Sequence, residues 1–272
     1  MKPNILKRLS ALAMTAVMAF SISGGVSAAD AATATIDTGR STSLTLYKYD
    51  LTGAENDGVW DSQSYVSTGI ADEQVNTALS QYAIQGVEFS YHKLADLSIY
   101  KGTAADGHQE TVPLYAFTEN TKTGSKETID FLSALGLTTN DAYRTDHDGK
   151  QNRVWYFKSD TLIEALNHAL TTNSTSTKDA LEKYIVDNVG TAMTETDENG
   201  YSKVEGLAQG LYLLVETRVP ENVTSTTDPF LVSLPMTTVD GAEWMYDITL
   251  YPKNETGKPT LEKTVRENHA DT

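Results

Sequence analysis

The stretch Trp244-Met-Tyr-Asp-Ile-Thr-Leu-Tyr-Pro-Lys-Asn254 has the alternating pattern of a β-strand that lies against a hydrophobic core. Successive side chains of a strand point to opposite faces, so every second residue shares a face. The apolar face holds Trp244, Tyr246, Ile248 and Leu250, and the same parity continues to Asn254. Asp247, Thr249, Tyr251 and Lys253 alternate with them. The pattern therefore predicts an inward Asn254 and a solvent-facing Lys253, with regular pairing ending at Pro252.

A second informative strand, Ser43-Leu-Thr-Leu-Tyr-Lys-Tyr-Asp-Leu51, lies near the other end of the chain. By parity Lys48 shares a face with Leu44 and Leu46. If that face is inward, the lysine is buried, which is costly unless the amine is neutral, paired or chemically consumed. Periodicity leaves the opposite orientation open, in which the tyrosines point inward and Lys48 is solvated.

The third informative strand is Gly210-Leu-Tyr-Leu-Leu-Val-Glu-Thr-Arg218. Both of its faces are apolar, as in a strand that is covered on each side. Glu216 is therefore expected to be buried whichever way the strand turns.

The distribution of periodic segments predicts a mainly β protein, a β-sandwich with an inserted α-helical region at about residues 123–190. Strands are expected at both ends of the chain, and residues 53–69 read as a loop. Amphipathic helices are expected at 125–135, from Asp160 to Leu170 and from about 180 to 189, with a Thr/Ser/Asn spacer at 171–177.

The N-terminus resembles a secretory signal peptide, with Lys2, Lys7 and Arg8 before an apolar run and small residues near Ala28. Removing residues 1–28 takes the formal net charge from −16 to −19. Such an acidic surface argues against nucleic acid as a partner. The expected organisation is a signal peptide at 1–28, one domain at 29–257 and the start of a second domain at 258–272.

The chemistry of three side chains fits a single reaction, namely those of Lys48, Glu216 and Asn254. A desolvated lysine is pushed toward its neutral, nucleophilic amine. A buried carboxyl group can stay protonated, polarise the amide of asparagine and shuttle protons as ammonia leaves. The trio predicts an amide bond between Lys48 and Asn254, promoted by Glu216. The alternative is a solvated Lys48, a Glu216 in an ordinary salt bridge and an Asn254 in a turn.

The segment that ends in Tyr-Pro-Lys-Asn resembles the pilin motif of sortase-assembled backbone pilins of Gram-positive bacteria. The matching positions are Trp244, Ile248, Leu250, Tyr251, Pro252, Lys253 and Asn254. Ile248 and Leu250 stand where valines are more usual. The resemblance implies that Lys253 is the nucleophile that joins one subunit to the next.

The sequences around Lys48 and Glu216 are similar to the lysine strand and the E-box of collagen-adhesin B-type domains, which have an Ig-like fold. Together these resemblances imply a cell-surface pilus subunit that is secreted and anchored to the cell wall. The implied partners are a pilin-specific sortase, further copies joined head to tail, and tip and base pilins.

Other classes of function have less support in the sequence. The five histidines lack metal-ligand spacing, the Asp/Asn/Gly turns do not continue as calcium loops, and no cofactor motif is present. Catalysis is expected only as autocatalytic bond formation. The main alternative is a cell-wall-anchored adhesin that binds a host ligand without polymerising, and an extracellular hydrolase ranks below it.

Overall fold

The computed structural model describes residues 36–61, 68–103, 107, 109–119, 124–188, 190–221, 223, 226–238 and 243–254. The expected signal peptide and second-domain start lie outside these residues. The elements are β1 (Thr42–Tyr47), β2 (Tyr49–Asp50), α1 (Leu51–Asn56), α2 (Glu73–Leu79), η1 (Ser80–Tyr82), β3 (Glu88–Thr103), β4 (Gln109–Thr118), α3 (Lys126–Ala134), η2 (Thr139–Asp141), β5 (Arg144–His147), β6 (Arg153–Phe157), α4 (Ser159–Asp187), β7 (Thr191–Ala192), β8 (Tyr201–Leu207), β9 (Gly210–Arg218), β10 (Phe230–Leu234), β11 (Met236–Thr237), β12 (Trp244–Met245), β13 (Asp247–Leu250) and β14 (Lys253–Asn254).

Two sheets face each other across a hydrophobic core. The smaller sheet has the strand order β13-β1-β8, and in it β1 runs parallel to β13 and antiparallel to β8. The larger sheet has the order β10-β9-β3-β4-β6-β5, with β7 also paired to β3. Apolar side chains of both sheets meet between them, among them Leu44, Leu46, Ile248, Phe89, Leu214 and Val232. The predicted β-sandwich is confirmed.

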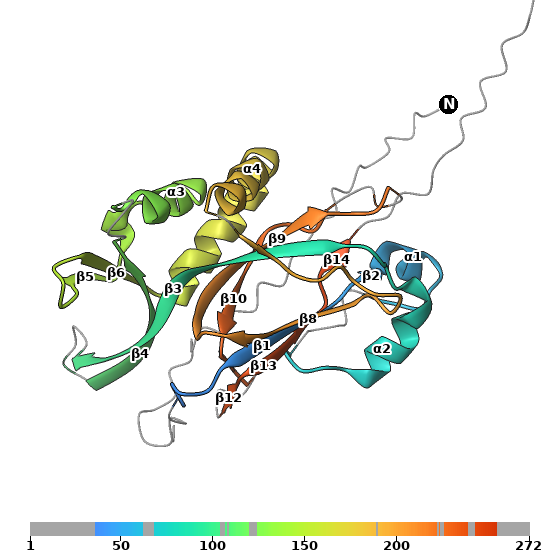
Figure 1. Ribbon diagram of the computed structural model, residues 1–272, viewed down its shortest axis with the longest axis horizontal. Helices are drawn as coiled ribbons and strands as arrows, with labels where there is room; N and C mark the ends of the chain where they lie inside the picture. The colour runs from blue at the N-terminus through green and yellow to red at the C-terminus, as the bar shows by residue number, and fades with distance from the viewer. Residues whose placement is uncertain are drawn as a thin grey trace, which may run out of the picture.

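The helices α3 and α4 cover the other face of the larger sheet (Figure 1). Leu162, Leu166 and Leu170 recur every four residues and are all buried, which gives α4 one apolar side. They join a core that includes the outer face of β9, namely Leu211, Leu213 and Val215. The strand β9 is thus covered on both faces, as its two apolar faces predicted, and the helical region is confirmed.

A third, smaller cluster lies where β1 ends. The helices α1 and α2 sit beside β2 and β14, near the start of β3 (Figure 1). Tyr49 and Leu51 pack there with Val75 and Leu79 of α2. The tyrosine face of the first strand is therefore partly covered as well, with Tyr49 buried and Tyr47 partly buried.

Two local predictions were wrong. Residues 51–56 form α1, whose N-terminus is capped by the Asp50 carboxylate at 2.8 Å from the Gly53 amide, although residues 53–69 were expected to be a loop. The predicted spacer at 171–177 is part of α4, interrupted only at Asn173, which has non-helical dihedral angles. The strand β3 is long, because after its pairing with β9 it continues to Thr103 and pairs there with β4.

Candidate functional site

Lys48 lies at the end of β1 with its side chain between the two sheets, and it is 0% exposed. Its backbone is fixed on both sides, because its amide donates to Gly200 O at 2.8 Å and its carbonyl accepts from Ile84 N at 2.9 Å. Gly200 has φ +71°, and a Cβ atom there would lie 2.3 Å from the Lys48 carbonyl oxygen. Only glycine fits this turn without displacing Lys48.

Glu216 of β9 is the ion-pair partner of Lys48. Nζ lies 3.0 Å from Glu216 Oε1, and both side chains are 0% exposed. Phe89 of β3 is paired directly with Glu216 across the sheet, and Nζ sits 5.3 Å from the centre of its ring. The amine and the carboxyl group therefore meet in an apolar chamber with an aromatic ring as one wall. The burial expected of Glu216 is confirmed, and of the two orientations left open for Lys48 the inward one is found.

Thr227, which precedes β10, is a third residue of this chamber. Its hydroxyl oxygen accepts a hydrogen bond from Lys48 Nζ, and its backbone amide donates to Glu216 Oε2 at 2.5 Å. Thr227 is 5% exposed. Sequence reasoning missed it, because it lies in a non-periodic segment whose position depends on the tertiary fold.

Burial controls the charge state of the amine. Loss of hydration lowers the pKa of Lys48 from 10.5 to about 8, while the carboxylate of Glu216 acts in the opposite direction. A minor fraction of the amine is therefore neutral near neutral pH, and the neutral form is the one that acts as a nucleophile.

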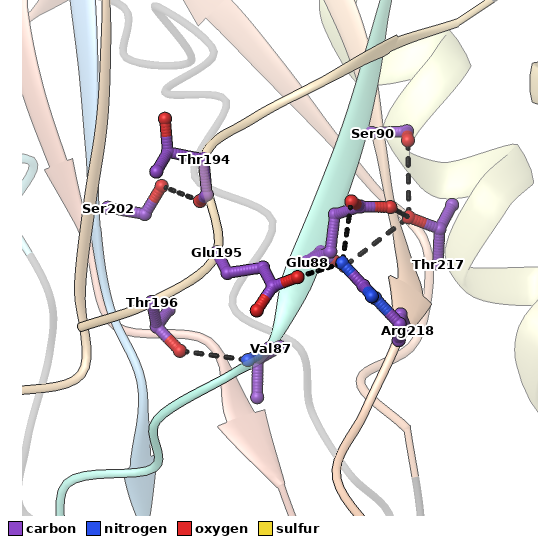
Figure 2. A network of polar contacts seen from close by, with 9 residues as sticks. All are labelled: Val87, Glu88, Ser90, Thr194, Glu195, Thr196, Ser202, Thr217 and Arg218. Carbon is purple, nitrogen blue, oxygen red and sulfur yellow. Dashed lines mark hydrogen bonds and ion pairs between the residues drawn. The ribbon is translucent and has the colours of Figure 1, made fainter. Parts of the chain in front are cut away.

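The residues that follow Glu216 are clamped to neighbouring strands (Figure 2). Arg218 forms ion pairs with Glu88 at 3.2 Å and with Glu195, and Thr217 Oγ1 donates to Glu88 Oε1 at 3.1 Å. The Arg218 side chain is 56% exposed, so each pair adds little stability alone. Together they fix the end of β9 against β3 and the segment before β8, which holds Glu216 in register.

At one end of the sandwich, residues 244–254 (the pilin-like segment) lie alongside β1, the strand that leads into Lys48. β13 pairs with β1 so that Leu250 lies opposite Leu46, and the same offset continues where Asn254 lies opposite Asp50 in the β2–β14 pair. Pairing is interrupted at Pro252, which has no amide hydrogen to donate. The backbone of Asn254 therefore lies on the strand next to that of Lys48.

Tyr251, which directly precedes Pro252, is held by contacts to two other segments. Tyr251 stacks on Tyr47 with ring centres 5.6 Å apart, and its hydroxyl accepts a hydrogen bond from the Asp72 amide at 2.8 Å. Since Asp72 caps α2, this contact joins the pilin-like segment to that helix.

The side-chain directions predicted for this segment are correct in part. Ile248 and Leu250 are in the core and Asp247 is exposed, while Trp244 is half-buried. The polar face was expected to meet solvent, yet Thr249 is 8% exposed, because the chain at Gly69 covers it and accepts its amide hydrogen at 2.8 Å. The predicted directions of the Lys253 and Asn254 side chains lie outside the described part of the structure.

The described residues hold neither a metal-ligand cluster nor a membrane-spanning helix. No group of three or more His, Asp or Glu side chains there could hold a metal ion. None of the helices in the described ranges is long and apolar enough to cross a membrane.

Comparisons with known proteins agree with one another, since each matches a pilin or fimbrial subunit. The family model described as Gram-positive pilin subunit D1, N-terminal domain, matches residues 39–255. The fimbrial subunit type 2 of Actinomyces naeslundii is 38% identical over 77 residues, which are 27% of this chain and 14% of that protein. The fimbrial subunit type 1 of Actinomyces viscosus is 50% identical over 46 residues, which are 16% of this chain and 8% of that protein.

Solved pilin structures are also similar. The full-length major pilin SpaD of Corynebacterium diphtheriae has a TM-score of 0.40 and 19% identity, over 82% of this chain and 34% of that one. The fimbrial protein FimP of Actinomyces oris has a TM-score of 0.38 and 19% identity, over 81% of this chain and 31% of that one. The chain thus spans about a third of these two pilins.

Proposed function

Because this chain belongs to the Gram-positive pilin subunits with an N-terminal D1 domain, we propose that it is joined into a covalent cell-surface pilus by a sortase acting on Lys253. The proposal includes secretion and anchoring to the cell wall, and contact with tip and base pilins. Its partners are a pilin-specific sortase and further copies of the same subunit.

The observation that carries the proposal is the position of the Lys253 backbone. It lies on β14, which pairs with β2 at the end of the sandwich, directly after a proline and a tyrosine that is bound to α2. A lysine on a firmly held strand suits an enzyme that must find the same amine on every subunit.

In the reaction, the sortase holds a second subunit as a thioester after cleaving its sorting signal. The neutral amine of Lys253 attacks the thioester carbon, so that an amide bond forms and the enzyme's thiolate is released. Repetition joins subunits head to tail, a heterologous contact that does not close into a ring.

The test is Lys253→Ala in the full-length pilin, expressed in cells that contain its sortase. The high-mass ladder on a denaturing gel should disappear, while Lys183→Ala, which removes a lysine of α4 that is 71% exposed, should leave it intact. An unchanged ladder in Lys253→Ala would reject the proposal. A chain that never forms a ladder would favour the monomeric adhesin.

We also propose an internal amide bond between Lys48 and Asn254. The neutral amine attacks the side-chain amide carbon of Asn254. The carboxyl group of Glu216 takes up the proton that the amine loses and gives a proton to the departing nitrogen, which leaves as ammonia. One C–N bond forms and one breaks, without an oxidant or a cofactor. The buried Lys48–Glu216 pair supports this reaction, as does the backbone of Asn254 on the adjacent strand.

Such a bond would join the first and last strands of the domain. The loop-closure model assigns a cross-link of this span about 5 kcal/mol of stabilisation. It would also convert a costly buried ammonium group into a neutral amide. Tension applied along the fibre at Lys253 would then be transmitted to β1 through a covalent bond.

A further inference from the structure

Thr227 makes contact with both groups that the proposed cross-linking reaction uses. Its hydroxyl oxygen accepts from the Lys48 amine, and its backbone amide donates to Glu216 Oε2 at 2.5 Å. The other carboxyl oxygen, Oε1, is the one that lies 3.0 Å from Nζ. One residue therefore constrains the nucleophile through its side chain and the proton-transfer group through its backbone.

The segment that carries Thr227 is itself held in place from two sides. The next residue, Asp228, forms an ion pair with Lys178 of α4, and these side chains are only 14% and 23% exposed. Two residues further on, Phe230 begins the ladder of β10 and pairs with Leu214. The hydroxyl group is thus presented to Lys48 by backbone that is anchored to both the helical layer and the sheet.

These contacts have specific chemical consequences. An N–H bond aimed at the Thr227 oxygen fixes rotation about the Cε–Nζ bond of Lys48, and with it the direction of the nitrogen lone pair. Because the Thr227 amide occupies Oε2 of Glu216, proton exchange with the amine is directed to Oε1. Alignment of this kind accounts for large rate effects when two groups must react in one geometry.

We propose that Thr227 is a third catalytic residue of the cross-linking centre, whose hydroxyl orients the Lys48 amine for attack while its amide holds the Glu216 carboxyl group. This inference rests on the proposed Lys48–Asn254 bond. The residue contributes no atom to the product, and the overall exchange of ammonia for an amide bond is unchanged.

The test compares Thr227→Val, which removes the hydroxyl and keeps the side-chain shape, with Thr227→Ser, which keeps the hydroxyl. The domain is synthesised in a cell-free system, samples are denatured at intervals, and the intact mass reports the loss of one ammonia. We expect Thr227→Val to slow this loss on the order of tenfold or more. The Thr227→Ser domain should form the cross-link at nearly the wild-type rate.

Thr42→Val is the matched control, because Thr42 is another buried threonine, whose hydroxyl donates to Leu207 O at the opposite end of β1 from Lys48. Circular dichroism measures the folded fraction, so that rates are compared per folded molecule. If valine prevents folding, Thr227→Ala removes the same hydroxyl without added bulk.

The outcomes separate the two proposals. If the wild-type domain forms the cross-link and Thr227→Val forms it equally fast, the role of Thr227 is overturned and the cross-link stands. Equal slowing in Thr227→Val and Thr227→Ser would also overturn it, because the hydroxyl would then be irrelevant. A wild-type domain that keeps its full mass would refute the cross-link and this inference together.

Discussion

Removing the carboxyl group of Glu216 is the perturbation with the largest expected consequence. In Glu216→Ala the amine of Lys48 stays in a chamber where it is 0% exposed, without the partner that lies 3.0 Å away in the wild type. The variant should also fail to form the bond to Asn254, since no group remains at this position to transfer the proton.

The magnitude follows from two separate losses. Breaking a buried ion pair by removing one partner costs roughly 3–5 kcal/mol, because the other charge is left uncompensated. Loss of the cross-link removes about 5 kcal/mol more in the loop-closure model. A total of roughly 8–10 kcal/mol is comparable with the whole stability of an ordinary domain, so Glu216→Ala should be unfolded or nearly so at room temperature.

Two comparison variants isolate these losses. Asn254→Ala removes the cross-link and keeps the ion pair, so it should lose only the loop-closure contribution. The double variant Lys48→Met, Glu216→Leu removes the cross-link and both buried charges, and should be at least as stable as Asn254→Ala. The assay is thermal unfolding by circular dichroism, with the intact mass of each variant measured in parallel.

The expected order of melting temperature is wild type first, then Asn254→Ala with the double variant, and Glu216→Ala last. A Glu216→Ala domain as stable as Asn254→Ala would refute the reasoning, since the buried amine would then need no partner. A wild type no more stable than Asn254→Ala would show that no covalent tie is present.

Three further perturbations test the surroundings of the pair. In Asn254→Ala, where the amine stays free, the pKa of Lys48 is about 8 when folded and 10.5 when unfolded, so the unfolded chain binds more protons between these values. Stability to urea should therefore rise as the pH increases from 8 to 10.5, whereas the double variant, which lacks Lys48, should show no such rise; equal pH dependence in the two variants would contradict the lowered pKa of Lys48. Gly200→Ala places a Cβ atom 2.3 Å from the Lys48 carbonyl at φ +71°, so it should lower the melting temperature and slow the loss of ammonia; a normal rate would show that this turn does not position the lysine. Tyr251→Phe removes the hydrogen bond to the Asp72 amide and should cost about 1 kcal/mol in urea unfolding, with weaker incorporation into the ladder; unchanged incorporation would mean that this contact does not position Lys253.

Strand periodicity predicted the burial of Glu216 but left that of Lys48 open. Glu216 lies on a strand with two apolar faces, so it was expected to be buried whichever way the strand turns, and it is. Lys48 shares a face with two leucines, but the other face of its strand carries tyrosines. Alternation could not decide between the leucine and tyrosine faces of the first strand. The structure removes that choice, because the helices α1 and α2 cover the tyrosines while the larger sheet covers the leucines.

The parts that sequence could not supply depend on contacts between distant segments. Residues 51–56 contain glycine and asparagine, which are weak helix formers, and become helical where Asp50 caps them and the Tyr49 cluster packs on them. Thr227 has no pattern around it that would single it out. Its place beside Lys48 results from the docking of the segment before β10 against α4.

The central claim is that the buried amine of Lys48 is bonded to the side chain of Asn254. The most direct test is the intact mass of the purified mature domain, followed by tryptic digestion and fragment sequencing. The account predicts a mass lower than that of the chain by one ammonia, and a branched peptide that joins the segments of Lys48 and Asn254. A full mass with two linear peptides would contradict it.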